Sequence, residues 1–344
     1  MSRVHDVTRK IKPLRIGELK SGGLILGYRC SSSCRHCLYA CGPHRDRGPN
    51  RSGELNRILD QLVIRGRKAR YHVGGGEPFL YVQRLEYVLR AFQRRHLILE
   101  YVESNAMWVR DQAHAEQILS QLAQSGLECV LVSLSPFLAE FVPLARTKAL
   151  IAAAEKVLPK GAFVWMPRFL EDLADVDPSR PIDLDRFLEE RGDDYAQQLG
   201  FRYALVPGGK AGRFLHGHGQ QIPFEQLLHP SPPCRARLED TSHFHVDLDG
   251  MYIPGLCAGL RVPFAEVGRE LHLERYPVLA AVAQNDLEGL IDLAREAGWE
   301  PDATYASSCD MCVHIRQYLF RTGKYAELGP PGFYDPMSIP GYGF

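Results

Sequence analysis

Four cysteines lie close together near the start of the chain, in the segment YRCSSSCRHCLYACG of residues 28–42. Cys30, Cys34 and Cys37 have the spacing CxxxCxxC, and Cys41 follows them. In a reducing compartment, clustered thiols are more often metal ligands than disulfides. Three thiolates leave a structural zinc ion one ligand short unless Cys41 completes the site. On a [4Fe–4S] cluster, three thiolates leave one iron open for chemistry.

A second set of cysteines lies in the last third of the chain. Its members are Cys234, Cys257, Cys309 and Cys312, and the last two form a CxxC motif. Four thiols are a closed ligand set for zinc or for a fully ligated iron–sulfur cluster, and ligand chemistry leaves both open. The ninth cysteine, Cys129, falls inside a predicted strand, where a buried thiol behaves as a small apolar side chain.

A glycine-rich turn, VGGGEPFL at residues 73–80, follows a predicted strand at 71–74. Glycines let backbone carbonyls approach a ligand, and Glu77 beside them can accept a hydrogen bond from an ammonium group. The run alone is a weak signal, because glycines are common in turns between strands and helices. The glycine run therefore indicates a binding site only in combination with a second motif, the CxxxCxxC segment.

Composition and charge exclude several classes of protein. The 344 residues are 45% hydrophobic and 24% charged, which is typical of a globular protein. Basic and acidic residues balance at 41 each, which argues against a nucleic-acid partner. No apolar run approaches the roughly 20 residues of a membrane span, and the first residues contain no apolar signal core. We therefore expect a cytoplasmic protein without a membrane partner.

Alternating strands and helices must position these motifs. The predicted strands are residues 24–28, 71–74, 97–102, 129–134, 162–166 and 203–206. Amphipathic stretches lie between them, one at 55–62 behind a predicted Ser52 cap. The alternation predicts an α/β fold, a partial (βα)6 TIM-like barrel, with a doubly wound open sheet as the alternative. We predict an N-terminal segment at 1–22, the barrel at 23–207 and a loop-rich, cysteine-containing extension at 208–344.

The CxxxCxxC motif after the first predicted strand and the GGEP motif after the second together resemble the radical S-adenosylmethionine (SAM) superfamily. The resemblance covers about residues 22–207 and implies a partial TIM-like barrel. It implies that Cys30, Cys34 and Cys37 bind a [4Fe–4S] cluster whose fourth iron is chelated by SAM. It also implies a site for the SAM amino group at Gly75, Gly76, Glu77 and Pro78.

The resemblance implies further roles at the ends of later strands. The positions that would contact the SAM ribose are Glu103, Asn105, Ser133 and Ser135. Arg168 would pair with the SAM carboxylate, which a guanidinium matches well. Each residue has a plain alternative, since Ser and Asn at strand ends often cap turns. Cys41 lies outside the cysteine triad, so we expect it to pack on the following helix, with a hydrogen-donor role as the alternative.

The C-terminal cysteines resemble the SPASM and twitch extensions that follow some radical SAM barrels. Cys234, an Asp-Gly turn at Gly250 and Cys257 are in the order that these extensions use. The set has four cysteines, fewer than a full SPASM extension carries. One twitch-like auxiliary [4Fe–4S] cluster is therefore the better match, with zinc as the alternative.

This resemblance implies an enzyme that reductively cleaves SAM to a 5′-deoxyadenosyl radical, which abstracts hydrogen from a substrate C–H bond. An auxiliary cluster would assist, and an electron donor such as flavodoxin or ferredoxin would supply the electron. We expect modification of a peptide or protein by cross-linking, oxidation or epimerisation. Dehydrogenation or rearrangement of a small metabolite, such as a sugar or nucleoside, is the alternative. A non-catalytic iron–sulfur or zinc protein has no need of the GGEP turn.

The chain before Cys30 is short. We expect no separate leader-peptide recognition domain there, which weakens a leader-guided version of the peptide hypothesis.

Overall fold

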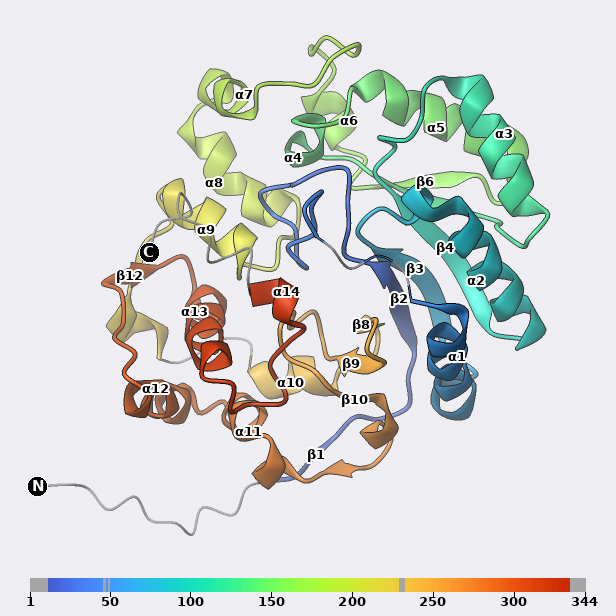
Figure 1. The fold of residues 1–344 in the computed structure, drawn as a ribbon. Coiled ribbons are helices and arrows are strands. Elements are labelled where there is room, and N and C mark those ends of the chain that lie inside the picture. The colour runs from blue at the N-terminus through green and yellow to red at the C-terminus, as the bar shows by residue number, and fades with distance from the viewer. Residues whose placement is uncertain (1–11, 46–47, 49, 229–232, 335–344) are drawn as a thin grey trace, which may run out of the picture.

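A curved, open sheet of eight strands forms the centre of the molecule (Figure 1). The computed structural model describes residues 12–45, 48, 50–228 and 233–334. The strand order is β10-β9-β8-β2-β3-β4-β5-β6, and β8 and β2 to β6 are all parallel. The strands are β2 Ser21–Gly27, β3 Arg70–Gly75, β4 Ile98–Ser104, β5 Val130–Ser133, β6 Ala162–Trp165, β8 Phe244–Val246, β9 Met251–Ile253 and β10 Val262–Pro263. The edges β10 and β6 do not pair with each other, so the barrel is not closed.

Four crossover helices cover the outer face of the sheet (Figure 1). They are α1 Ser52–Gly66, α2 Val82–Arg94, α3 Gln112–Ala123 and α5 Leu144–Val157. Each buries an apolar stripe, with Leu59, Val88 and Leu119 fully inaccessible to solvent. Because each helix returns the chain to the same end of the sheet, the carboxyl ends of β2 to β6 meet on one side. Active sites of α/β barrels are built at this side.

The remaining elements are short. In the first two thirds of the chain they are η1 Pro78–Tyr81, α4 Pro136–Ala139, α6 Phe169–Asp172, α7 Leu184–Arg191, α8 Asp193–Arg202 and α9 Lys210–Gly217. The later helices are η2 Phe224–Leu227, α10 Cys234–Glu239, η3 Phe264–Glu266, η4 Leu273–Arg275, α11 Pro277–Ala283, α12 Leu287–Glu296, α13 Ser308–Arg321 and α14 Pro331–Tyr334. Two small antiparallel pairs join β1 Leu14–Arg15 to β11 Glu270–Leu271 and β7 Ile222–Pro223 to β12 Thr304–Tyr305.

Five of the six predicted barrel strands are present as β2 to β6, but the prediction of a strand at 203–206 is wrong. This segment closes the carboxyl end of α8. Ala204 has a φ of +52°, and the Leu205 N–H donates to the Gly200 carbonyl at 2.8 Å, as at a helix end with a left-handed residue. The sixth parallel strand is β8, which comes from the C-terminal region and pairs with β2.

The sheet continues across the predicted boundary between residues 207 and 208, because β8, β9 and β10 follow that boundary in sequence. The division into a barrel at 23–207 and an extension at 208–344 stays a prediction. Residues 1–11 of the predicted N-terminal segment lie outside the described residues. Ser52 is the first residue of α1 rather than its cap, and the Arg51 N–H donates to Glu54 Oε2 at 3.1 Å. Within the described part of the chain, no helix is long and apolar enough to cross a membrane.

Candidate functional site

A cavity at the carboxyl ends of the parallel strands brings most of the predicted site residues together. Its volume is about 1200 Å³ including the open mouth. The predicted residues that line it are Cys30, Cys34, Cys37, Cys41, Gly75, Gly76, Glu103, Asn105, Ser133 and Ser135. The loop that carries the cysteines lies between the sheet and α9, where Lys210 Nζ donates to the Ser33 carbonyl at 3.2 Å (Figure 1).

The thiols of the cysteine loop are close to one another and hydrogen-bonded. Burial raises the pKa of Cys30 to about 12, and burial together with the neighbouring thiols raises the pKa of Cys34. A hydrogen bond with the Cys41 thiol lowers the pKa of Cys37 to about 6. The Cys41 N–H also donates to Cys37 Sγ at 3.3 Å, and Asn105 Nδ2 donates to Cys30 Sγ at 3.4 Å. Hydrogen bonds to sulfur are how proteins orient and tune thiolate metal ligands.

Cys41 is buried in the wall of this cavity. Its N–H contacts Cys37 Sγ, and its packing on the following helix stays a prediction. Its hydrogen-donor role stays a prediction.

The glycine turn after β3 packs directly against the chain that leads into the cysteine loop. The Gly76 N–H donates to the Gly27 carbonyl at 2.7 Å, and the Glu77 N–H donates to the Arg29 carbonyl at 3.1 Å. A Cβ added to Gly76 would lie 2.0 Å from the Arg29 carbonyl oxygen. Gly75 has a φ of +115°, in the region that favours glycine. These two glycines are required by the close approach of the two backbones.

We expect Gly76→Ala to destabilise the protein by about 2 kcal/mol or more, because the colliding atom belongs to backbone and cannot rotate away. Urea unfolding of the purified variant measures this loss. Gly53→Ala is the matched control, since an added Cβ there meets no atom within 4 Å. Equal stability of Gly76→Ala and the wild type would contradict the described packing.

Three predicted residues do not line the cavity. Glu77 is buried, and its carboxylate accepts hydrogen bonds from Phe79 N at 3.1 Å, Ser104 Oγ at 3.2 Å and Asn105 N at 2.6 Å. Burial raises the pKa of Glu77 to about 7 against the opposing effect of these hydrogen bonds. The Glu77 side chain therefore ties the β3 turn to the end of β4.

The other two residues outside the cavity lining are Pro78 and Arg168. Pro78 is buried at the start of η1, and Arg168 is exposed before α6. The SAM contacts that the sequence predicts for Glu77, Pro78 and Arg168 stay predictions.

Three separate segments bring the four C-terminal cysteines to a second, mostly apolar cavity. Cys234 begins α10, Cys257 follows the turn after β9, and Cys309 and Cys312 lie in the first turn of α13. The start of α13 is capped by Ser307, whose hydroxyl accepts from Asp310 N at 3.0 Å. Helix N-termini favour thiolates over thiols.

Two guanidinium groups face these thiols. Arg237 Nη1 lies 3.6 Å from Cys309 Sγ, and the buried Arg316 donates to the Ala258 carbonyl at 2.9 Å and lies close to Cys257 and Cys312. A buried cation needs a compensating negative charge. Four thiolates around a zinc ion or an iron–sulfur cluster carry that charge, so this donor set fits a thiolate-bound metal group.

Arg316→Met keeps the volume of the side chain but removes its charge. We expect this variant to retain less metal at the C-terminal cysteines and to lose about 3 kcal/mol of stability, because the thiolates lose their buried cation. Metal analysis after dialysis against a chelator, with urea unfolding, measures both effects. Arg295→Met, at an exposed position of α12, serves as the control. Unchanged metal retention in Arg316→Met would contradict a charge-compensating role.

The two cavities share one apolar wall. Leu38, Val206 and Leu256 line both of them. Val206 belongs to the segment that was predicted as a sixth strand, and Tyr203 and Leu205 of the same segment also line the first cavity. The apolar pattern of residues 203–206 therefore marks a cavity wall.

Sequence reasoning missed a group of histidines beside the first cavity. His72 lies within β3, His243 directly precedes β8, and His245 lies within β8. A signal was present in the HFH pattern of residues 243–245, because alternate residues of a strand point to the same face. The pairing of β8 with β2, which brings these residues near His72, cannot be read from the sequence pattern.

No family model matches this sequence, and no curated protein matches it. Distant similarity exists to solved structures. The structure "Native anSMEcpe with bound AdoMet" is 12% identical, with 93% of this chain and 100% of that chain covered and a TM-score of 0.42. SuiB of Streptococcus suis bound to S-adenosylmethionine is 14% identical, with 70% and 60% covered and a TM-score of 0.37. BtrN in complex with AdoMet and 2-DOIA is 15% identical, with 33% and 45% covered and a TM-score of 0.28.

The chain thus spans less than half the length of BtrN and three fifths of that of SuiB. These similarities are too remote to establish a shared fold or activity.

Proposed function

We propose that this protein is a radical SAM enzyme whose SAM-binding [4Fe–4S] cluster is held by Cys30, Cys34 and Cys37. One observation carries the proposal. The three thiols line the same cavity as the glycine turn after β3 and as Asn105 after β4. A structural metal site has no need of an open cavity beside its thiols, whereas a cofactor bound next to a cluster does.

The spacing of the thiols supports a cluster over a single ion. A tetrahedral zinc ion with bonds of about 2.3 Å holds its sulfurs about 3.8 Å apart. Among the described residues, no three cysteines bring their sulfurs within 4.8 Å of one another. Ligands on separate irons of a cluster lie further apart than ligands of one ion. The donor set therefore fits a [4Fe–4S] cluster better than zinc at both cysteine groups.

The residues of the first cavity divide into two roles. Gly75 and Gly76 line the cavity, and their backbone carbonyls would accept from the SAM ammonium group, while Glu77 fixes the turn. Asn105, Ser133 and Ser135 would contact the ribose, and Ser135 also caps α4. Cys30, Cys34 and Cys37 would hold the cluster, which would supply the electron for reductive cleavage of SAM and so for hydrogen abstraction from a substrate C–H bond. The buried walls exclude water and other hydrogen donors from that space.

The second cavity would hold an auxiliary [4Fe–4S] cluster at Cys234, Cys257, Cys309 and Cys312, with zinc as the alternative. The shared wall of Leu38, Val206 and Leu256 supports this role, because it separates the two cavities by a single layer of side chains. An electron left on the product can pass through so thin a wall. A flavodoxin or ferredoxin would reduce the enzyme.

A peptide or protein is the proposed substrate. Strand β6 is an edge of the sheet, and its inward-facing Phe163 and Trp165 are 41% and 43% exposed. Trp165 also lines the first cavity. An edge strand with exposed aromatic side chains suits an extended peptide, which pairs with the edge through its backbone. A small metabolite bound wholly inside the cavity is the alternative.

Anaerobic reconstitution with iron and sulfide, followed by dithionite and SAM, tests the proposal. We expect 5′-deoxyadenosine and methionine, detected by mass spectrometry, and further 5′-deoxyadenosine when a substrate is present. Addition of peptide mixtures and of metabolite mixtures in parallel separates the two substrate classes. A fully loaded, reduced protein that forms no 5′-deoxyadenosine with any mixture would contradict the proposed enzyme.

A further inference from the structure

Three histidines, which belong to neither cysteine set, meet on the inner face of the sheet. His72, His243 and His245 each offer a ring nitrogen, and these three nitrogens lie within 4.8 Å of one another. Gly23 of β2 is the direct neighbour of both His72 and His245 in the strand pairing. A Cβ at Gly23 would lie 2.4 Å from His72 Nε2 and 2.5 Å from the His245 ring. Because Gly23 has no side chain, the rings of His72 and His245 can approach each other across β2.

The distances suit ligands of one metal ion. The Nε2 atoms of His72 and His245 are 3.3 Å apart. A tetrahedral ion with metal–nitrogen bonds of about 2.0–2.1 Å separates its ligand nitrogens by about 3.4 Å. Glu103 Oε1 lies 3.6 Å from His72 Nε2, so a carboxylate oxygen is available beside the imidazoles. The alternative is a hydrogen bond between two neutral imidazoles with no ion between them.

The surroundings favour a cation at this point. His72 and His245 are buried, and the neutral imidazole that burial favours is the form of histidine that binds metals. Among the described residues, the sole ion-pair partner of Glu103 within 4.0 Å is the His72 ring. A divalent ion would supply the positive charge that this carboxylate lacks.

We propose that His72, His243, His245 and Glu103 bind one divalent transition-metal ion, for which zinc is the fitting choice. Three nitrogen ligands with one oxygen complete a tetrahedral site, which suits zinc. His243, His245 and Glu103 also line the cavity that contains the N-terminal cysteines. The ion would thus lie in the wall of that cavity, where an oxygen or nitrogen atom of a bound molecule would add as a fifth ligand. Glu103 belongs to this site rather than to the SAM ribose.

This inference goes beyond the radical SAM proposal and stands without it. The ligands come from the sheet and not from the cysteine loop, so zinc binding here requires neither iron nor SAM. Its test therefore uses metal binding and not turnover.

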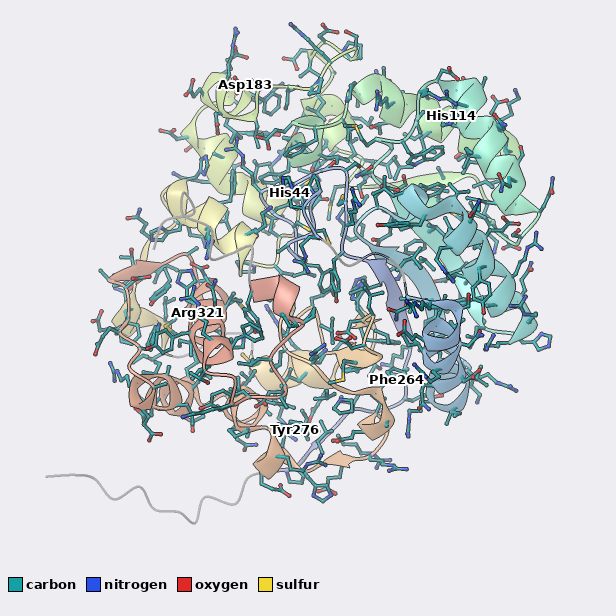
Figure 2. All side chains as sticks on the ribbon, in the orientation of Figure 1. His44, His114, Asp183, Phe264, Tyr276 and Arg321 are labelled. Carbon is teal, nitrogen blue, oxygen red and sulfur yellow. The ribbon has the colours of Figure 1, made fainter. Side chains whose placement is uncertain are left out.

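The experiment uses the full chain with its cysteines first loaded with iron and sulfide under anaerobic conditions. The protein is then dialysed against zinc sulfate, and zinc is measured by mass spectrometry and by X-ray absorption at the zinc edge. We expect one zinc per chain with nitrogen and oxygen neighbours at about 2.0–2.1 Å. His243→Gln, at the half-buried position, should bind this zinc more than about tenfold more weakly. His114→Gln is the matched control, since His114 lies on α3 at the outer side of the molecule (Figure 2).

Thermal unfolding with and without zinc keeps the test independent of folding defects. Zinc should raise the unfolding temperature of the wild type and of His114→Gln, but not that of a folded His243→Gln. Two outcomes would overturn the proposal. One is equal zinc affinity in the wild type and His243→Gln. The other is zinc surrounded by sulfur alone, at about 2.3 Å. If the iron-loaded protein fails to cleave SAM, the zinc result is unaffected.

Discussion

We expect the replacement of Cys34 with alanine to remove about four irons per chain and to lower SAM cleavage by more than about 100-fold. Cys34 is the central thiol of the loop, and its pKa is raised by burial and by the neighbouring Cys37 and Cys30. Two remaining thiols cannot hold a cluster that leaves one iron open for SAM. Iron analysis and mass spectrometry of 5′-deoxyadenosine measure the two losses on the same preparation.

Cys129→Ala is the control for this prediction. Cys129 is also a buried thiol, but its Sγ contacts the Lys160 carbonyl at 3.8 Å and it does not line the cavity. The control should keep both the iron and the activity. Full iron loading and normal SAM cleavage by Cys34→Ala would show that the cysteine triad is not the cofactor site.

The double variant Cys309→Ala/Cys312→Ala should lose the C-terminal metal and retain SAM cleavage. These two thiols lie in the first turn of α13, whose inner face is part of the main core. Loss of the metal should therefore also lower the unfolding temperature. A metal that binds only the folded chain adds its binding free energy to the free energy of unfolding. We expect the iron content to fall from about eight to about four per chain if the group is a [4Fe–4S] cluster. A loss of one zinc, with iron unchanged, would identify the zinc alternative.

Two results would contradict this division of roles. The first is complete loss of 5′-deoxyadenosine in a double variant that still folds, because it would place SAM cleavage at the second set. The second is unchanged content of both metals, because the four cysteines would then hold no metal. Circular dichroism of the purified variant checks that the protein is folded before either result is interpreted.

Much of the fold could be predicted from the sequence where the signals are local. Strands β2 to β6 fall where apolar runs alternate with amphipathic helices, because a parallel strand covered on both faces reads as a continuous apolar segment. The glycine turn and the cysteine loop could be placed at adjacent strand ends for the same reason. Their common cavity follows from parallel strands whose carboxyl ends lie together.

The features that could not be predicted depend on contacts between residues that are far apart in the sequence. The sixth parallel strand is Phe244–Val246, which pairs with β2 after a long excursion of the chain, and no local periodicity indicates that pairing. Tyr203–Val206 has the apolar character of a strand, but the preceding helix ends there and the side chains line the cavity. The histidine group depends on the register of β3, β2 and β8, which sets His72 and His245 on either side of Gly23.

The most direct test of the central claim is electron paramagnetic resonance of the reduced, reconstituted protein before and after addition of SAM. In the proposed enzyme, an iron without a protein ligand would lie beside the cavity that Gly75 and Asn105 line. SAM should therefore change the g-values of the cluster held by Cys30, Cys34 and Cys37, and the change should be absent in Cys34→Ala. A spectrum that SAM leaves unaltered, in protein that carries the reduced cluster, would contradict the account.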